Sequence, residues 1–146
     1  MLKRLLNILI ITMGLLINSN QLMAEKMTKE LHSLEELLWQ NRLLLIRVTS
    51  FDSLKADLQS QTEAIDDRRI AWFVVDSKQL LRTNLSVKLT STLQKEISGI
   101  LNSYGDSVAL LIGYDGEIKA VQGKLNLVDF FDAIDEMPIR KMEMAR

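Results

Sequence analysis

The residues best suited to charge-based chemistry lie near the end of the chain. Asp135 and Glu136 occupy the expected C-terminus of the last helix, where the helix dipole disfavours acidic side chains. Carboxylates in that position need a cationic partner, which Arg42 or Arg140 could supply. We favour a structural role, in which an ion pair locks the C-terminal tail onto the body and Pro138 fixes the turn.

A second interpretation of the same segment stays open. An exposed Arg140 could bind a carboxylate or another anion on a partner, with Met137, Met142 and Met144 as an adaptable apolar contact. Trp39 leaves a similar choice: we favour packing under the edge of a sheet, and the alternative is an exposed binding anchor.

The chain offers no thiol chemistry, because it contains no cysteine. Thiol–disulfide exchange and thiol peroxidation require a thiolate nucleophile. Ser50 and Ser53 cannot replace it without an adjacent general base, and the single histidine, His32, is far from them in sequence. We expect His32 to be an ordinary surface residue, and we predict no catalytic residue.

Metal and cofactor sites are also not expected. One histidine and no cysteine exclude a structural zinc site. Residues 66–69 (Asp-Asp-Arg-Arg) lack the alternating oxygen ligands and the glycine turn of a calcium loop, so we interpret them as a solvated link. The glycines are scattered and form no phosphate-binding loop.

The N-terminus is typical of a secretory signal peptide. Lys3 and Arg4 precede an apolar run over residues 5–17, and Met23-Ala24 is followed by charged sequence. We predict cleavage after Ala24 and export to the periplasm or the exterior. The alternative is an uncleaved anchor, although the run is short for a membrane span of about 20 residues.

The mature chain, residues 25–146, is long enough for a single domain. It keeps 16 basic and 19 acidic residues, so its net charge is −3. This charge gives no general attraction to nucleic acid. After cleavage, no stable membrane span is expected.

Apolar patterning predicts strands that alternate with helices. We expect helices over residues 28–38, from Asp52 or Ser53 to about 65, over 89–101 with Gly105 as cap, and from Asn126 to Pro138. Strands are expected over residues 43–48, 70–75, 108–112 and 118–121, with a polar loop from 76 to about 86. Asp115-Gly116 indicates a two-residue hairpin turn, and Lys119 is expected to point to solvent.

This order indicates an α/β protein with a sheet of about four strands and flanking helices. The first two strands, joined through a helix, should be parallel with a right-handed crossover. A β-hairpin and a C-terminal helix then complete the layout of the thioredoxin fold. The position at which a thioredoxin-like enzyme would carry its nucleophile is occupied by residues 49–53 (Thr-Ser-Phe-Asp-Ser).

Four short motifs also carry a family resemblance. They are residues 39–42 (Trp-Gln-Asn-Arg), 67–70 (Asp-Arg-Arg-Ile), 113–119 (Gly-Tyr-Asp-Gly-Glu-Ile-Lys) and 134–144 (Ile-Asp-Glu-Met-Pro-Ile-Arg-Lys-Met-Glu-Met). In this order the chain resembles the P-DUDES family, an exported bacterial domain of unknown function that also occurs in vertebrate sushi-repeat matrix proteins. The candidate interaction or motif residues are Trp39, Arg42, Arg68, Asp115, Gly116, Lys119, Asp135, Met137, Pro138, Arg140 and Glu143.

The resemblance implies a peroxiredoxin-like variant of the thioredoxin fold that lacks the reactive cysteines. It implies that the domain is exported, but it implies no catalysed reaction. The first function hypothesis is therefore an exported, non-catalytic interaction or scaffold module whose partner is an envelope or extracellular protein. The alternatives are an enzyme or redox-accessory protein with thiol-free chemistry, and an envelope-associated structural protein whose motifs serve folding only.

Overall fold

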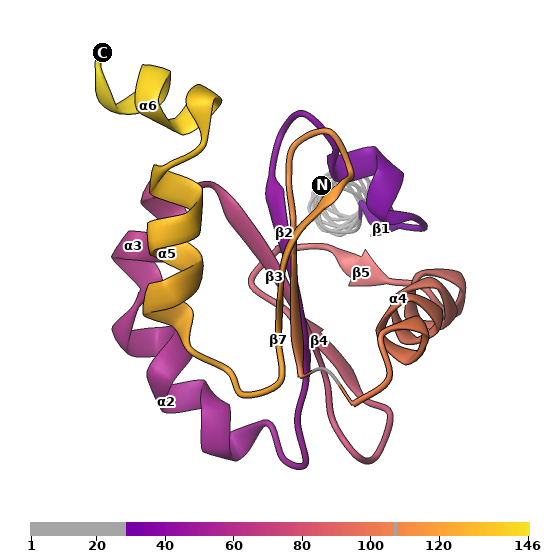
Figure 1. Ribbon diagram of the computed structural model, residues 1–146. Helices are drawn as coiled ribbons and strands as arrows, with labels where there is room; N and C mark the ends of the chain where they lie inside the picture. Colours follow the sequence, from indigo (N-terminus) through magenta and orange to yellow (C-terminus); the bar gives the residue numbers. More distant parts are fainter. Residues whose placement is uncertain (1–28, 107) are drawn as a thin grey trace, which may run out of the picture. The chain divides into compact units, whose positions relative to one another are not determined.

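The computed structural model describes residues 29–106 and 108–146 (Figure 1). The chain divides into two compact units, residues 1–30 and 31–146, and the second unit carries the fold and the site described below. The expected signal peptide, residues 1–24, lies outside the described residues, as does residue 28, the expected start of the first helix.

A five-stranded mixed sheet forms the centre of the second unit. Its strands, in spatial order, are β4 (Leu81–Thr83), β3 (Ile70–Val75), β2 (Arg42–Arg47), β6 (Ala109–Ile112) and β7 (Ile118–Gln122). Strands β2 and β3 are parallel. The other pairs are antiparallel: β4 with β3, β6 with β2, and β7 with β6. Apart from this sheet lie β1 (Glu30–Leu31) and β5 (Lys88–Leu89), where the Leu31 carbonyl accepts a hydrogen bond from the Thr90 backbone.

Helices cover both faces of the sheet (Figure 1). The helical segments are η1 (Leu34–Leu37), a 3₁₀ turn, and α2 (Asp52–Ser60), α3 (Thr62–Asp67), α4 (Ser91–Ser103), α5 (Leu127–Asp135) and α6 (Pro138–Met144). Helices α2, α3 and α5 lie on one face, and α4 lies on the other. Helix α6 follows α5 at one end of the sheet.

Strand β2 is almost continuously apolar because it lies at the centre of a sheet that is covered on both faces. Leu43 and Leu45 pack into the core beneath α4, while Leu44 and Ile46 pack into the core beneath α2, α3 and α5. Since successive side chains of a strand point to opposite faces, a strand covered on both faces needs apolar residues at every position.

The topology confirms the predicted fold class. Strand β2 leads through α2 and α3 to its parallel neighbour β3, and the antiparallel pair β6–β7 is followed by α5. The strand order β3-β2-β6-β7 with these directions is that of the thioredoxin fold. Strand β4 adds an antiparallel edge beside β3.

The expected helix over residues 28–38 is wrong. Ser33 caps a single 3₁₀ turn: its side chain accepts from the turn, and Glu36 bonds back to the Ser33 backbone. This capping box starts the helical segment at Leu34 rather than at residue 28. The turn then ends before Trp39, whose φ of 63° sends the chain into β2.

The region after β2 differs in detail. The N-cap position is Phe51 rather than Asp52 or Ser53, and the expected single helix is interrupted at Gln61, between α2 and α3. The polar loop expected after residue 75 contains β4. The Asp76 carboxylate accepts the backbone N–H groups of Lys78 and Leu80, which turns the chain back onto β3.

The remaining caps and turns are a mixture of confirmed and wrong predictions. Asn126 caps α5 as predicted, and Gly105 has the left-handed φ of 60° expected of a helix cap. The hairpin is not closed by two residues: the Gly113 N–H bonds to the Glu117 carbonyl around a three-residue turn in which Gly116 has φ 82°. Pro138 does not stop α5, which ends at Asp135; it opens α6 instead.

Candidate functional site

Three arginines meet at the end of the sheet where the parallel strands begin. Arg42 is the first residue of β2, Arg68 directly follows α3 before β3, and Arg140 comes from α6. We call these residues, with Asp67, Asp135, Glu143 and Tyr114, the arginine cluster. Every candidate residue named from the sequence except Trp39 belongs to this cluster, the adjoining hairpin or the α5–α6 segment, and Trp39 precedes β2 and bonds to the hairpin through the Tyr114 carbonyl.

Arg42 is completely buried and lies at the inner side of the cluster. Its guanidinium donates to the Arg68 carbonyl at 2.8 Å, to the Tyr114 hydroxyl at 3.0 Å and to the Glu143 carboxylate at 3.2 Å. It also lies over the Tyr114 ring, 4.1 Å from the centroid. Its Nε has no hydrogen-bond partner within the described part of the chain. The Tyr114 hydroxyl donates in turn to Glu143 at 2.9 Å, so α6 is bound to β2 and to the hairpin.

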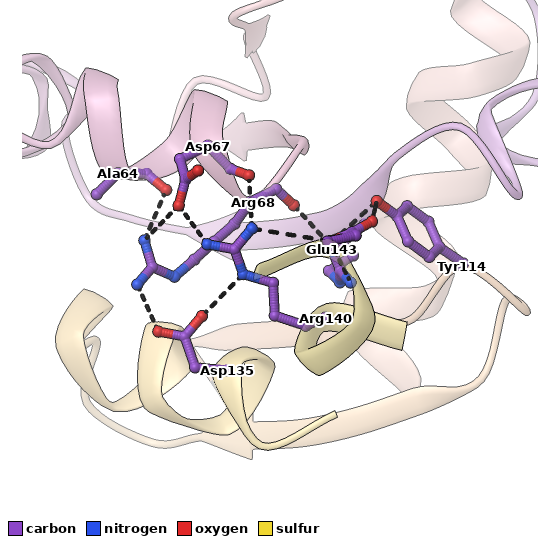
Figure 2. Close-up of polar contacts among 8 residues, drawn as sticks. Ala64, Asp67, Arg68, Tyr114, Asp135, Arg140 and Glu143 are labelled. Atoms are coloured by element: carbon purple, nitrogen blue, oxygen red, sulfur yellow. Dashed lines mark hydrogen bonds and ion pairs between the residues drawn. The ribbon is translucent and has the colours of Figure 1, made fainter. Parts of the chain in front are cut away.

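Arg140 and Arg68 share the Asp135 carboxylate. Figure 2 shows Arg140 between Asp67 and Asp135, with Nε 3.1 Å from the Asp135 carboxylate and a terminal nitrogen 3.0 Å from the Asp67 carbonyl. The Asp67 carboxylate forms a further ion pair with Arg140. Arg68 reaches the second oxygen of Asp135 at 2.5 Å and covers the Phe131 ring. These contacts join α3, α5 and α6.

The cluster holds Asp135 and Glu143 in the ionised form. Burial raises the pKa of the Asp135 carboxyl, but the hydrogen bonds from Arg68 and Arg140 outweigh it, and the pKa lies below its ordinary value. Burial acts in the same way on Glu143, where the Tyr114 hydrogen bond and the Arg42 charge bring the pKa down. The Tyr114 pKa is raised, by burial and by its bond to Glu143.

This geometry favours the structural interpretation of Arg140. Its side chain is 6% exposed and fully engaged with Asp67, Asp135 and the neighbouring Glu143, so the alternative of an exposed Arg140 does not fit. The Arg140–Asp135 pair is the one expected from the sequence, whereas the other partners differ. Asp135 binds Arg68 as well as Arg140, Arg42 binds Glu143, and Glu136 pairs with Lys141 at the surface.

Two further sequence interpretations are wrong at this end of the sheet. Residues 66–69 are not merely a solvated link, because Asp67 and Arg68 are part of the cluster. Lys119 does not point freely to solvent: its ammonium lies 2.7 Å from the Asp115 carboxylate and 2.8 Å from that of Glu117. The Asp115 pKa is lowered, chiefly by the hydrogen bond from Lys119.

Helix α6 has the charged side chains of Arg140 and Glu143 turned toward the body, whereas its apolar side chains lie at the surface together with Lys141. Arg140 is 5% exposed, whereas Ile139 is 40%, Met142 is 60% and Met144 is 52% exposed. An ordinary surface helix shows the opposite arrangement. Trp39 is 70% exposed, so the expectation that it packs in the core is wrong. Its left-handed backbone, held by an N–H bond to the Tyr114 carbonyl, places it outside the core.

A shallow groove of about 210 Å³ lies between the hairpin and the start of α6. We call it the α6 groove. Its lining includes Trp39, Arg42, Tyr114, Met137, Pro138 and Ile139. The charged atoms that border it are neutralised by each other, as in the Lys119–Asp115 pair. The groove can therefore accept an apolar group without exposing an unpaired charge to it.

At the opposite end of the sheet, where β2 and β3 finish, Ser53 and Asp76 are engaged in structural hydrogen bonds. The Ser53 hydroxyl donates to the Ser50 carbonyl at 2.7 Å rather than to a base. The nearby Asp76 carboxylate is held by Arg82 at 2.9 Å, and its pKa is lowered first of all by this bond. His32 is exposed and lies on another part of the chain, between β1 and η1.

Residues 29–106 and 108–146 contain neither a metal-binding cluster nor a membrane-spanning helix. No group of three or more His, Cys, Asp or Glu side chains is arranged to hold a metal ion there. No helix in this same part is long and apolar enough to cross a membrane.

The fold and the cysteine-free sequence define a thioredoxin-like domain in which the motif residues lie at the start of the parallel strands. A family model described as a domain of unknown function, DUF4174, matches residues 33–143, and the chain belongs to this family. Among solved structures, the reduced 2-Cys peroxiredoxin of Plasmodium vivax is similar, with 20% identity over 76% of this chain and 84% of that chain and a TM-score of 0.48. None of the curated proteins compared with the chain matches it.

Proposed function

We propose that this protein is an exported, non-catalytic interaction module whose binding surface is the outer face of α6 together with Trp39. The observation that carries the proposal is the inverted polarity of α6, with Arg140 inside and Met142 outside. Isolated exposed apolar residues need no explanation, but here Trp39 and Ile139 border one groove. Tryptophan is also among the residue types enriched at binding hot spots.

The arginine cluster supports this proposal by making the surface rigid. Ion pairs from Asp67 of α3, Asp135 of α5 and Arg42 of β2 fix the position of α6, so its outer side chains are presented in one arrangement. A preorganised surface loses less conformational entropy on binding. On this view the motif residues of the cluster serve the surface indirectly, while Trp39 and the α6 groove make the contact.

Export and the P-DUDES relationship belong to the same proposal. The basic start, the apolar run and the Met23-Ala24 site favour a mature protein that begins at Glu25. The four sequence motifs favour kinship with the P-DUDES proteins and hence with the sushi-repeat matrix proteins. N-terminal sequencing of the protein from fractionated cells tests the export step, and an intact Met1 would contradict cleavage.

Partner capture from a cell-envelope extract tests the surface. Wild type is compared with Trp39→Ala and Met142→Ala, and with Val128→Ala as the matched control, because Val128 is 54% exposed on the neighbouring α5. All four proteins should melt at similar temperatures. We expect one set of partners to be lost in the first two variants and kept by the control. Retention of every partner by Trp39→Ala and Met142→Ala would overturn the proposal.

A further inference from the structure

The chemistry of the partner can be inferred from one more residue, Arg69. It lies between Arg68 and the first residue of β3, at the same end of the sheet as the α6 groove. Its carbonyl accepts the Arg42 N–H at 3.0 Å, which places its backbone next to the start of β2. The Arg69 charge also acts on the hydroxyl of Tyr114, a residue that lines the groove.

Arg69 is exposed, and its guanidinium makes no hydrogen bond or ion pair with any residue in the described part of the chain. The other cations that surround the groove are occupied. Lys119 pairs with two carboxylates, Lys141 pairs with Glu136, and the remaining arginines are held in the cluster. Arg69 is therefore an exposed cation at this end of the sheet to which no carboxylate of the described residues is paired, although its charge acts on Glu143 and Tyr114.

The backbone keeps Arg69 and Trp39 in the positions that expose them. Arg69 has φ 51° and Trp39 has φ 63°, both in the left-handed region that disfavours bulky side chains. The Arg69 N–H bonds to the Asp66 carbonyl at 2.9 Å, and the Trp39 N–H bonds to Tyr114 at the same distance. The backbone of each residue is therefore fixed, and tryptophan and arginine are among the residue types enriched in hot spots.

We propose that this surface binds a protein segment in which an apolar side chain stands next to a carboxylate. The apolar side chain enters the α6 groove against Trp39 and Ile139, and the carboxylate pairs with the Arg69 guanidinium. Arginine suits this role because its planar fork matches a carboxylate. This inference rests on the proposed function and specifies the partner of the same surface.

Nuclear magnetic resonance titration with short blocked peptides tests the inference. The probes are acetyl-Gly-Leu-Glu-amide and the matched peptides that end in Gln or in Lys, added to the mature protein up to about 10 mM, since fragments of this size bind weakly. We expect the Glu peptide to shift the Trp39 indole N–H and the Ile139 methyl signals. We also expect it to bind about threefold more tightly than the Gln peptide, as one exposed ion pair allows.

The controls separate the charge from the groove. In Arg69→Gln, a surface change that should leave the melting temperature unaltered, the Glu and Gln peptides should bind equally. In Lys78→Gln, a change of an exposed lysine after β3, the threefold preference should remain. A preference for the Lys peptide, or no shift at Trp39 with any peptide, would overturn the inference.

Two outcomes keep this inference distinct from the proposed function. If the Trp39 signals move on dilution without any peptide, the surface pairs with a second copy of the chain, and the acidic-segment inference is wrong. If the peptides fail while envelope capture still depends on Trp39 and Met142, the interaction module stands and only its acidic partner is overturned.

Discussion

The two ends of the central sheet differ in the sequence separation of the residues that their polar contacts join. Where β2 and β3 finish, short polar residues satisfy one another locally: Ser53 bonds to Ser50, and Asp76 closes its own turn and binds Arg82. Where the two strands begin, buried arginines tie together segments that are about a hundred residues apart in sequence, as in the Arg42–Glu143 pair. The polar groups of the first end shape loops, and those of the second end fasten a helix.

This difference shows how a fold can present a surface without catalytic groups. Ion pairs under α6 replace the apolar packing that a surface helix normally uses, and its apolar side chains are left for the outside. Burying such charges is no guarantee of extra stability, because desolvation offsets much of the attraction. Their removal one at a time is nevertheless costly, and this gives the comparison its strongest test.

The largest expected effect is at Arg42. Arg42→Met keeps an apolar stem but leaves Glu143 and the Tyr114 hydroxyl without their cation, so it should destabilise the protein by about 3–5 kcal/mol. Arg82→Met, at the other end, removes a partly exposed cation from the buried Asp76 carboxylate. That carboxylate keeps its bonds from the backbone N–H groups of Lys78 and Leu80, so the change should cost about 1–2 kcal/mol. Urea unfolding followed by circular dichroism measures both, and equal losses would abolish the distinction between the ends.

The apolar patterns of the sequence were sufficient for the sheet but not for the cluster. Strand β3 matches the predicted residues 70–75, and Asn126 caps α5 as expected, because both signals are local. The Arg68–Asp135 pair depends on how α3 packs beside α5, and no local pattern contains that information. The exposure of Trp39 depends on one backbone angle, for which a tryptophan gives no signal.

Acid should weaken the arginine cluster before it affects the core. The pKa values of Asp135 and Glu143 are lowered in the folded protein, against ordinary values of 3.8 and 4.5. Carboxylates of this kind contribute stability above their unfolded pKa and lose it as the pH falls through the folded pKa, so the loss should be confined to pH values below about 4.5.

Melting temperatures between pH 7 and pH 2.5 measure this loss. Glu143→Gln should lower the melting temperature at pH 7 and flatten its fall in acid, because one of the titrating groups is gone. Asp52→Asn provides the control at the other end, since this carboxylate makes no ion pair among the described residues and its removal should leave the melting temperature at pH 7 nearly unchanged. An identical profile for wild type and Glu143→Gln would show that the cluster does not govern acid stability.

The smallest expected effect concerns the strained backbone at each end. Trp39 at one end and Gln79 at the other both have positive φ, where glycine is free of the steric penalty that other residues carry. Because glycine also increases the entropy of the unfolded chain, Trp39→Gly and Gln79→Gly should each change stability by no more than about 1 kcal/mol, toward greater stability.

Partner capture then separates the two substitutions. If the left-handed tryptophan is retained for binding, Trp39→Gly should lose the envelope partners while Gln79→Gly keeps them, although both proteins are folded and equally stable. Loss of partners in both variants would mean that rigidity of the whole sheet, rather than the side chain at the α6 groove, controls binding. If Trp39→Gly keeps every partner, the exposed apolar side chains of α6 (Ile139, Met142 and Met144) carry the contact without Trp39.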